Sequence, residues 1–155
     1  MKAWRIAKAK RATDLSGYGA ALEGGRWNHK DVPALYLGLS PSVCCLETFV
    51  HASGPPVMPL KIIYLELPDD APYYTPDILP EGWQSLPADR ASMDFGTEWL
   101  NSLHHLGMIV PSAVMPLDQN IVINPRHSAW SKIRIIDIQE FLYDKRMFRV
   151  RGDSV

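Results

Sequence analysis

Apolar residues recur along this chain with two spacings, one typical of strands and one typical of helices. Short apolar or alternating runs predict strands within residues 1–7, 32–39, 60–67, 108–110, 113–115, 120–124 and 133–138. Apolar positions three and four residues apart predict two principal helices, one starting at Ser40-Pro41 and one spanning residues 89–106, with Gly107 as its stop. The strands do not alternate strictly with the helices, which favours an α+β fold.

Two stretches show neither spacing and are predicted to be irregular. Residues 8–26 are polar and contain four glycines, so we expect a loop that can bring backbone close to a ligand. Five prolines occur from position 68 to position 87, which predicts a long surface segment without regular structure.

Size and charge limit the classes of protein to consider. A chain of 155 residues can build one well-buried core, so we expect a single domain over residues 1–155. The net charge of -1 at pH 7 offers no basic surface for nucleic acid. The sequence contains neither a signal peptide nor an apolar run long enough to span a membrane. We therefore expect a cytoplasmic protein that contacts neither nucleic acid nor membrane directly.

Glu47 is the most informative polar residue, because it lies on the apolar stripe of the first helix. Val43, Leu46, Glu47 and Val50 fall at positions i, i+3, i+4 and i+7, so the carboxylate is predicted to face inward. An inward carboxylate usually has a partner or a task, because burying an unpaired charge is costly. Two structural interpretations remain open beside a functional one: a stripe edge that reaches solvent, or an ion pair.

The only cysteines, Cys44 and Cys45, are adjacent on the same predicted helix, where neighbouring side chains diverge. They can form neither a disulfide framework nor a zinc site, and we expect no metal. A cysteine nucleophile with His51 as base is conceivable from the residue types. It is disfavoured because free cysteines inside a helix usually behave as small, inert apolar residues.

Several short motifs follow one another from the start of the chain to residue 127. They are Trp4-Arg5-Ile6, Gly25-Arg26-Trp27-Asn28, Tyr36 before Ser40-Pro41, Leu46-Glu47 with Val50-His51, Pro111-Ser112-Ala113-Val114-Met115-Pro116, and Asn124-Pro125-Arg126-His127. In these motifs the chain resembles the RES-domain family, the toxins of bacterial Xre-RES toxin-antitoxin pairs. The resemblance implies an ADP-ribosyltransferase-like split β-sheet with flanking helices and a central cleft that holds NAD.

The resemblance also implies that the catalytic residues are Glu47, Arg26, Tyr36 and Ser112. Cleavage of the nicotinamide-ribose bond passes through an oxocarbenium-like state, whose positive charge a carboxylate such as Glu47 can stabilise. A guanidinium on a Gly-rich loop, Arg26, suits the pyrophosphate of NAD in charge and geometry. Tyr36 offers a ring to the nicotinamide and a hydroxyl to its ribose, and Ser112 could hydrogen-bond either group. 

Two further residues, Arg5 and Asn124, are expected as additional contacts of NAD. The resemblance implies a cognate Xre-family antitoxin whose helix-turn-helix supplies the DNA contact that this chain lacks. It also allows a homodimer within the toxin-antitoxin complex.

Three functions are compatible with these residues and with the resemblance. The first is a toxin that degrades NAD, as a phosphorylase or a glycohydrolase, with inorganic phosphate or water as acceptor. The second uses the same site to transfer ADP-ribose to a cellular protein. The third is a non-catalytic binding module whose cleft serves only a partner protein.

Overall fold

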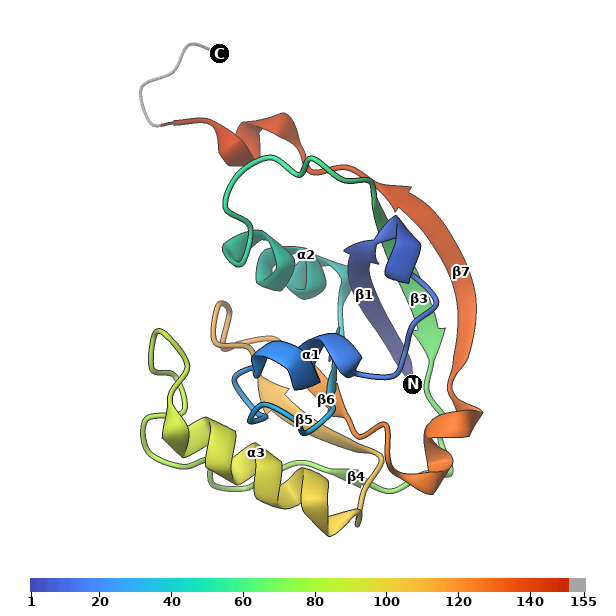
Figure 1. The fold of residues 1–155 in the computed structure, drawn as a ribbon, viewed down its shortest axis with the longest axis vertical. Coiled ribbons are helices and arrows are strands. Elements are labelled where there is room, and N and C mark those ends of the chain that lie inside the picture. The colour runs from blue at the N-terminus through green and yellow to red at the C-terminus, as the bar shows by residue number, and fades with distance from the viewer. Residues whose placement is uncertain (151–155) are drawn as a thin grey trace.

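The computed structural model describes residues 1–150, and seven strands make up its sheet (Figure 1). The strands are β1 (Lys2–Lys8), β2 (Leu35–Gly38), β3 (Leu60–Glu66), β4 (Tyr73–Tyr74), β5 (Gly107–Pro111), β6 (Gln119–Ile123) and β7 (Arg134–Phe141). Their order across the sheet is β4-β5-β6-β2-β1-β3-β7. Only β4 and β5 run parallel among the paired strands, and the other neighbours are antiparallel. Residues 151–155, which the predicted domain includes, lie outside the described residues.

In the described part of the chain, residues 1–150, three α-helices and three short 3-10 helices accompany the sheet. They are α1 (Tyr18–Glu23), α2 (Pro41–Val50), α3 (Arg90–Ser102), η1 (Ala9–Arg11), η2 (Ser128–Lys132) and η3 (Lys145–Phe148). The start of α2 is confirmed as predicted, because Ser40 Oγ accepts a 3.1 Å bond from the Val43 N–H and Pro41 occupies the first turn.

The sheet is split near its middle. β1 pairs with β3 along its whole length, from Lys2↔Glu66 to Lys8↔Leu60, but meets β2 only at Trp4↔Gly38. The half formed by β4, β5, β6 and β2 therefore diverges from the half formed by β1, β3 and β7. The predicted α+β fold with a split sheet is confirmed.

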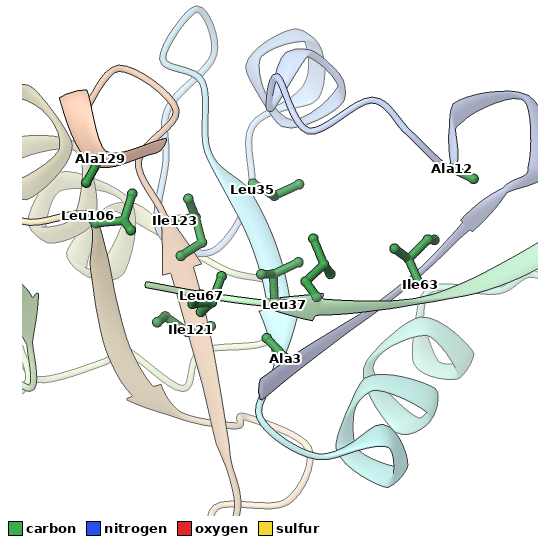
Figure 2. Packing of buried hydrophobic residues seen from close by; sticks show 11 residues of the cluster. Ala3, Ala12, Leu35, Leu37, Ile63, Leu67, Leu106, Ile121, Ile123 and Ala129 are labelled. Carbon is green, nitrogen blue, oxygen red and sulfur yellow. The ribbon is translucent and has the colours of Figure 1, made fainter. Parts of the chain in front are cut away.

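Alternation along the strands divides the apolar residues between two cores. One core joins both halves of the sheet and includes Leu35, Leu37 and Ile121 (Figure 2). The second core lies under α3 and includes Trp99, Met108 and Val122. Because successive side chains point to opposite faces of a strand, Tyr36 and Asn120 lie on the face of the second core.

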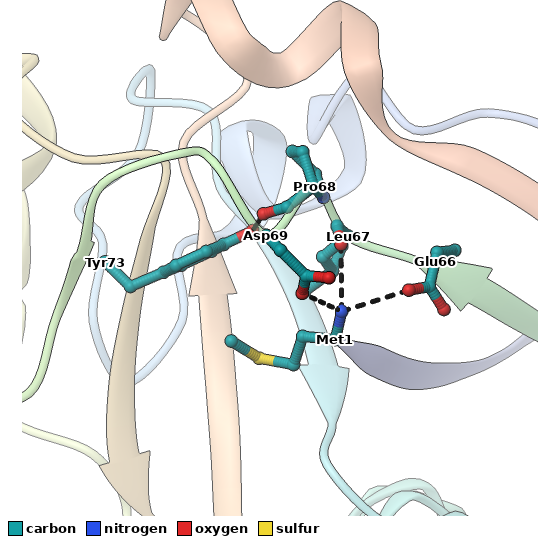
Figure 3. Close-up of polar contacts among 6 residues, drawn as sticks. All are labelled: Met1, Glu66, Leu67, Pro68, Asp69 and Tyr73. Carbon is teal, nitrogen blue, oxygen red and sulfur yellow. Dashed lines mark hydrogen bonds and ion pairs between the residues drawn. The ribbon is translucent and has the colours of Figure 1, made fainter.

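The N-terminal ammonium fastens β1 to the end of β3 (Figure 3). It donates to Glu66 Oε1 at 3.1 Å, to the Leu67 carbonyl at 2.9 Å and to Asp69 Oδ1 at 2.9 Å. The Tyr73 hydroxyl donates to the Pro68 carbonyl at 2.6 Å and holds the chain as it leaves β3. These contacts fix the strand that carries the single junction between the two halves of the sheet.

Two predicted irregular stretches contain regular structure. η1 and α1 lie within residues 8–26, and both are too short to show a helical repeat of apolar residues. β4 interrupts the proline-rich segment with a two-residue parallel pairing to β5, which no local pattern announces.

Other predicted boundaries were wrong. Residues 113–115 are not a strand but part of the turn between β5 and β6, closed by bonds from the Ser112 N–H to the Asp118 carbonyl and from the Asp118 N–H to the Met115 carbonyl. α3 ends before Gly107, because Leu103 adopts a left-handed φ of 59°. β7 continues to Phe141, since its whole length pairs with β3. Within residues 1–150, no helix is both long and apolar enough to cross a membrane.

Candidate functional site

α2 carries Glu47 over the junction of the sheet because it packs closely on β2. A Cβ atom at Gly38 would lie 2.9 Å from both the backbone nitrogen and the Cβ of Cys44, so only glycine allows this approach. Val43 and Cys44 are the residues of α2 that are buried against the sheet, and Glu47 follows Cys44 by about one helical turn. The carboxylate is thereby directed toward the ends of β5 and β6.

Two neutral donors hold the Glu47 carboxylate by the same oxygen. Ser112 Oγ donates to Glu47 Oε1 at 2.6 Å, and Asn120 Nδ2 donates to the same atom at 2.8 Å. Within residues 1–150, Glu47 has no cationic partner and its Oε2 accepts no hydrogen bond. Glu47 is only partly buried, and Val50 of the same predicted stripe is 51% exposed, so the carboxylate keeps some access to solvent. Within residues 1–150 it is not half of an ion pair. Its negative charge is held in place without being neutralised.

Ser112 is fully buried and uses all of its hydrogen-bonding capacity. Its hydroxyl donates to Glu47 and accepts 3.1 Å bonds from the N–H groups of Val114 and Met115. A hydroxyl has one proton and two acceptor lone pairs, so none remains for a ligand in this arrangement. Ser112 meets Glu47, and its expected contact with nicotinamide or ribose stays a prediction.

Asn120 is the residue that sequence reasoning missed. The sequence places it at the start of a predicted strand, where asparagine normally marks only a boundary. Its role depends on the partner across the sheet, since Gly38 stands opposite it and leaves room for α2. No local signal distinguishes such an asparagine.

Tyr36 closes the loop that contains Arg26. Its hydroxyl donates to Asn28 Oδ1 at 2.6 Å and accepts from the Trp27 N–H at 2.9 Å. Burial raises the pKa of this hydroxyl far above its usual range, and the bond from Trp27 and the charge of Arg26 offset only part of that effect. The hydroxyl therefore remains a proton donor committed to the protein, while the ring lies on the face of the sheet shared with Asn120.

Arg26 lies on a loop pressed against α3. A Cβ atom at Gly96 would lie 2.0 Å from the Trp27 carbonyl oxygen, so the helix must have glycine at this point. The His29 N–H also donates to Thr97 Oγ1 at 2.9 Å. Arg26 Nη1 donates to the carbonyls of Trp83 at 2.7 Å and Ser85 at 3.0 Å. The loop and its guanidinium are thus held from two sides.

Glu47 and Ser112 share a direct hydrogen bond, whereas Tyr36 and Arg26 are connected to them only through neighbouring positions. Tyr36↔Val122 and Gly38↔Asn120 are pairs of the β2-β6 ladder, so Tyr36 and Asn120 are diagonal neighbours on one face. Asn120 bonds to Glu47, which also bonds to Ser112. At the other end, the Tyr36 hydroxyl bonds to the backbone of Trp27, the residue after Arg26.

The two additional predicted residues make other contacts. Arg5 Nη1 donates to the Arg11 carbonyl at 3.0 Å and the Ala12 carbonyl at 3.5 Å, and burial lowers its pKa. Asn124 is fully buried, with its Nδ2 donating to the Leu100 carbonyl at 2.8 Å near the end of α3. The structure links neither side chain to Glu47 by a hydrogen bond, and their contact with NAD stays a prediction.

Two cavities are lined by neither Glu47 nor Arg26, and Cys44 is a poor nucleophile. A cavity of about 130 Å³ lies against Trp4 and Tyr64, and one of about 230 Å³ lies between Pro55 and Phe148. Burial raises the pKa of Cys44 to about 11, so its thiol stays protonated near neutral pH and is a poor nucleophile. Among residues 1–150, no group of three or more His, Cys, Asp or Glu side chains could hold a metal ion.

Comparison with known proteins identifies the family. The RES domain profile matches residues 2–144. This chain belongs to the RES domain family. The Prs ADP-ribosylating toxin of Sphingobium sp. (strain YBL2) is 40% identical over 154 residues, covering 94% of this chain and 96% of that toxin. Toxin Res of Yersinia enterocolitica is 37% identical over 139 residues, covering 88% of this chain and 91% of the relative.

The fold of this RES domain also has a solved counterpart. The crystal structure of the M. tuberculosis MbcT-MbcA toxin-antitoxin complex contains a chain that superposes with a TM-score of 0.71 and 21% identity. The match covers 91% of this chain and 84% of the other. The predicted membership among RES-domain toxins is thereby confirmed, as is the ADP-ribosyltransferase-like fold class.

Proposed function

We propose that this RES-domain toxin cleaves the bond between nicotinamide and ribose in NAD. The observation that carries the proposal is the Glu47 carboxylate, anchored through Oε1 by neutral donors and left without a counter-charge. Oxocarbenium-like states develop positive charge on the ribose, and a fixed anion stabilises that charge without reorganising. Glu47 Oε2, which accepts no bond within residues 1–150, is the atom we assign to face the ribose.

The reaction needs no general acid at the leaving group. The bond between C1 of the ribose and the pyridinium nitrogen breaks, and its electron pair leaves with nicotinamide, which becomes neutral. An oxygen of phosphate or water then bonds to C1, giving ADP-ribose 1-phosphate or ADP-ribose, and a proton from the acceptor passes to solvent. One carboxylate is enough for this chemistry.

The other residues receive distinct roles in this proposal. Arg26 binds the pyrophosphate, because guanidinium groups suit phosphates in charge and geometry. Tyr36 contacts the nicotinamide by its ring, since its hydroxyl is bonded to Asn28 and Trp27. Ser112 and Asn120 are positioning residues that fix the carboxylate.

A second candidate function is transfer of ADP-ribose to a protein. It is favoured by the relative named Prs ADP-ribosylating toxin, which is 40% identical to this chain. Both candidates share the bond that breaks and differ only in the acceptor. We further propose a cognate antitoxin partner, supported by the solved relative, which comes from a toxin-antitoxin complex. The Xre type of that antitoxin is a proposal that rests on the family resemblance alone.

The experiment is a nicotinamide-release assay on the purified protein, with and without phosphate. We expect release by the wild type, with the ADP-ribose product identified by mass spectrometry, and release reduced at least about 10³-fold by Glu47→Gln. The glutamine keeps an oxygen for Ser112 and Asn120, so its unfolding midpoint should stay near that of the wild type. Lysate with labelled NAD separates the candidates, because label retained on a protein band indicates transfer. NAD left intact by the wild type under all conditions would refute both.

A further inference from the structure

The segment between β4 and α3, residues 75–89, is here called the strap. It is part of the proline-rich stretch, and it leads into the first turn of α3 (Figure 1). Trp83 is its main internal anchor, stacked on Trp27 with ring centroids 6.1 Å apart and an interplanar angle of 23°. Ile78 is 84% exposed and Leu86 is 83% exposed, so these apolar residues of the strap do little to hold it.

Leu79 of the strap also packs against the second core, and the polar anchor of the strap is Arg26. Its Nη1 donates to the carbonyls of Trp83 and Ser85, at 2.7 Å and 3.0 Å. Trp83 is therefore held twice, through its ring by Trp27 and through its carbonyl by the residue before Trp27. The strap and the Arg26 loop behave as one packed unit, although more than fifty residues separate them in the sequence.

The way Arg26 is held leaves one edge of its guanidinium open. A guanidinium has five N–H groups in one plane, of which Nη1 carries two. Both Nη1 protons are accounted for by the two strap carbonyls. Within residues 1–150, Nε and Nη2 make no hydrogen bond, and their parallel N–H groups form the fork that binds phosphate in a bidentate manner.

We propose that the strap positions Arg26 for the pyrophosphate of the dinucleotide. The Trp83 and Ser85 carbonyls fix the plane of the guanidinium, so that its free edge is oriented before the substrate arrives. This inference rests on the proposed NAD-cleaving function and adds Trp83 as a positioning residue that acts through Arg26. A ligand without a phosphate, such as nicotinamide riboside, gains nothing from the strap.

The test measures NAD binding by calorimetry in the Glu47→Gln protein, where turnover does not interfere. Trp83→Ala should weaken NAD binding about tenfold, as expected when a charge-assisted contact loses its orientation. In a chain that also carries Arg26→Ala, the same substitution should change affinity less than about twofold, because the strap acts only through the guanidinium. Trp83→Phe should recover part of the affinity, since a phenyl ring can still stack on Trp27.

Leu86→Ala is the matched control, because this exposed strap residue should leave NAD affinity unchanged. A second variant, Gly82→Ala, shifts the strap without removing an aromatic ring. Gly82 has a φ of 86°, which alanine adopts only with strain, while the added methyl would meet ordinary contacts at 3.6 Å or more. It should weaken NAD binding in the same direction as Trp83→Ala, with nicotinamide riboside binding unaffected.

Amide exchange supplies a readout independent of NAD. Arg26→Ala should speed exchange across residues 75–89, and unchanged exchange there would show that Arg26 does not hold the strap. Equal losses from Trp83→Ala with and without Arg26, or no NAD binding by Glu47→Gln, would also overturn the inference. NAD that binds as described but is never cleaved by the wild type would instead refute the proposed function and leave the strap's role standing.

Discussion

Ser112 and Glu47, 65 residues apart in sequence, are joined by a 2.6 Å hydrogen bond from the serine hydroxyl to Oε1. Asn120 adds a second bond to the same oxygen, at 2.8 Å. Two donors on one oxygen restrict the rotation of the carboxylate and leave Oε2 open within residues 1–150. The arrangement joins α2 to the strand ends of β5 and β6, so the shape of the sheet sets the direction of the charge.

Ser112→Ala should reduce both stability and nicotinamide release. It removes the donor to Glu47 and leaves the N–H groups of Val114 and Met115 without their acceptor. We expect the free energy of unfolding to fall by about 1–3 kcal/mol and turnover to fall roughly tenfold or more. Urea unfolding and the release assay measure the two effects, with the exposed Ser131→Ala as control. A loss of turnover at unchanged stability would show that the hydroxyl serves the substrate instead.

Asn120→Ala should lower turnover with little change in KM for NAD. The substitution removes one of the two hydrogen-bond donors to Glu47 Oε1, so the carboxylate samples more orientations. The residues proposed to bind NAD are unchanged. We expect a loss of about tenfold in kcat, and a larger loss for Asn120→Asp at neutral pH, because two carboxylates would then face each other. Asn101→Ala, on the exposed side of α3, is the control. An unchanged kcat in Asn120→Ala would remove this residue from the mechanism.

Tyr36→Phe should destabilise the protein more than it slows the reaction. It leaves Asn28 Oδ1 and the Trp27 N–H without partners, and Asn28 is fully buried. We expect a loss of about 1–3 kcal/mol in the free energy of unfolding. Release measured well below the unfolding midpoint should persist, since the ring remains. Tyr18→Phe, at a position 54% exposed, is the control. If stability holds and release disappears, the hydroxyl acts on the ribose.

Acidification should weaken the fold through His105. Burial lowers the pKa of this imidazole below its ordinary 6.5, and His104 and His127 lower it further. A lowered pKa means that the unfolded chain binds the proton more readily, so stability is complete above pH 6.5 and is lost as the pH falls through the folded-state pKa. Protonation at Nδ1 would also break the 3.2 Å bond that Trp99 Nε1 donates to it.

The corresponding measurement is the free energy of unfolding at pH 7.5 and at about pH 5. The wild type should lose more stability between these values than His105→Asn, whose Oδ1 can accept from Trp99 without titrating. The exposed His51→Asn should keep the wild-type slope. Identical slopes for wild type and His105→Asn would contradict the assignment.

Features that depend on neighbours along the chain could be predicted from the sequence. Ser40-Pro41 marks the start of α2 by local capping, and the apolar run of β3 marks a strand by composition. α1 and β4 were missed because a six-residue helix and a two-residue strand carry no measurable period. The 113–115 segment was misread because a short apolar run can also form a turn when its ends are bonded to each other.

The sequence by itself determined that Glu47 lies on the side of its helix that meets the sheet, where it is partly buried, and that the motifs belong to one family, since helical spacing and motif order are one-dimensional properties. Only the tertiary structure decided what surrounds that carboxylate. Asn120 reaches it because Gly38, opposite Asn120, lets α2 approach the sheet, and Arg26 is held by a strap that no local pattern connects to it. Such contacts depend on strand register and helix packing between distant segments, and neither is encoded in the spacing of residues within one element.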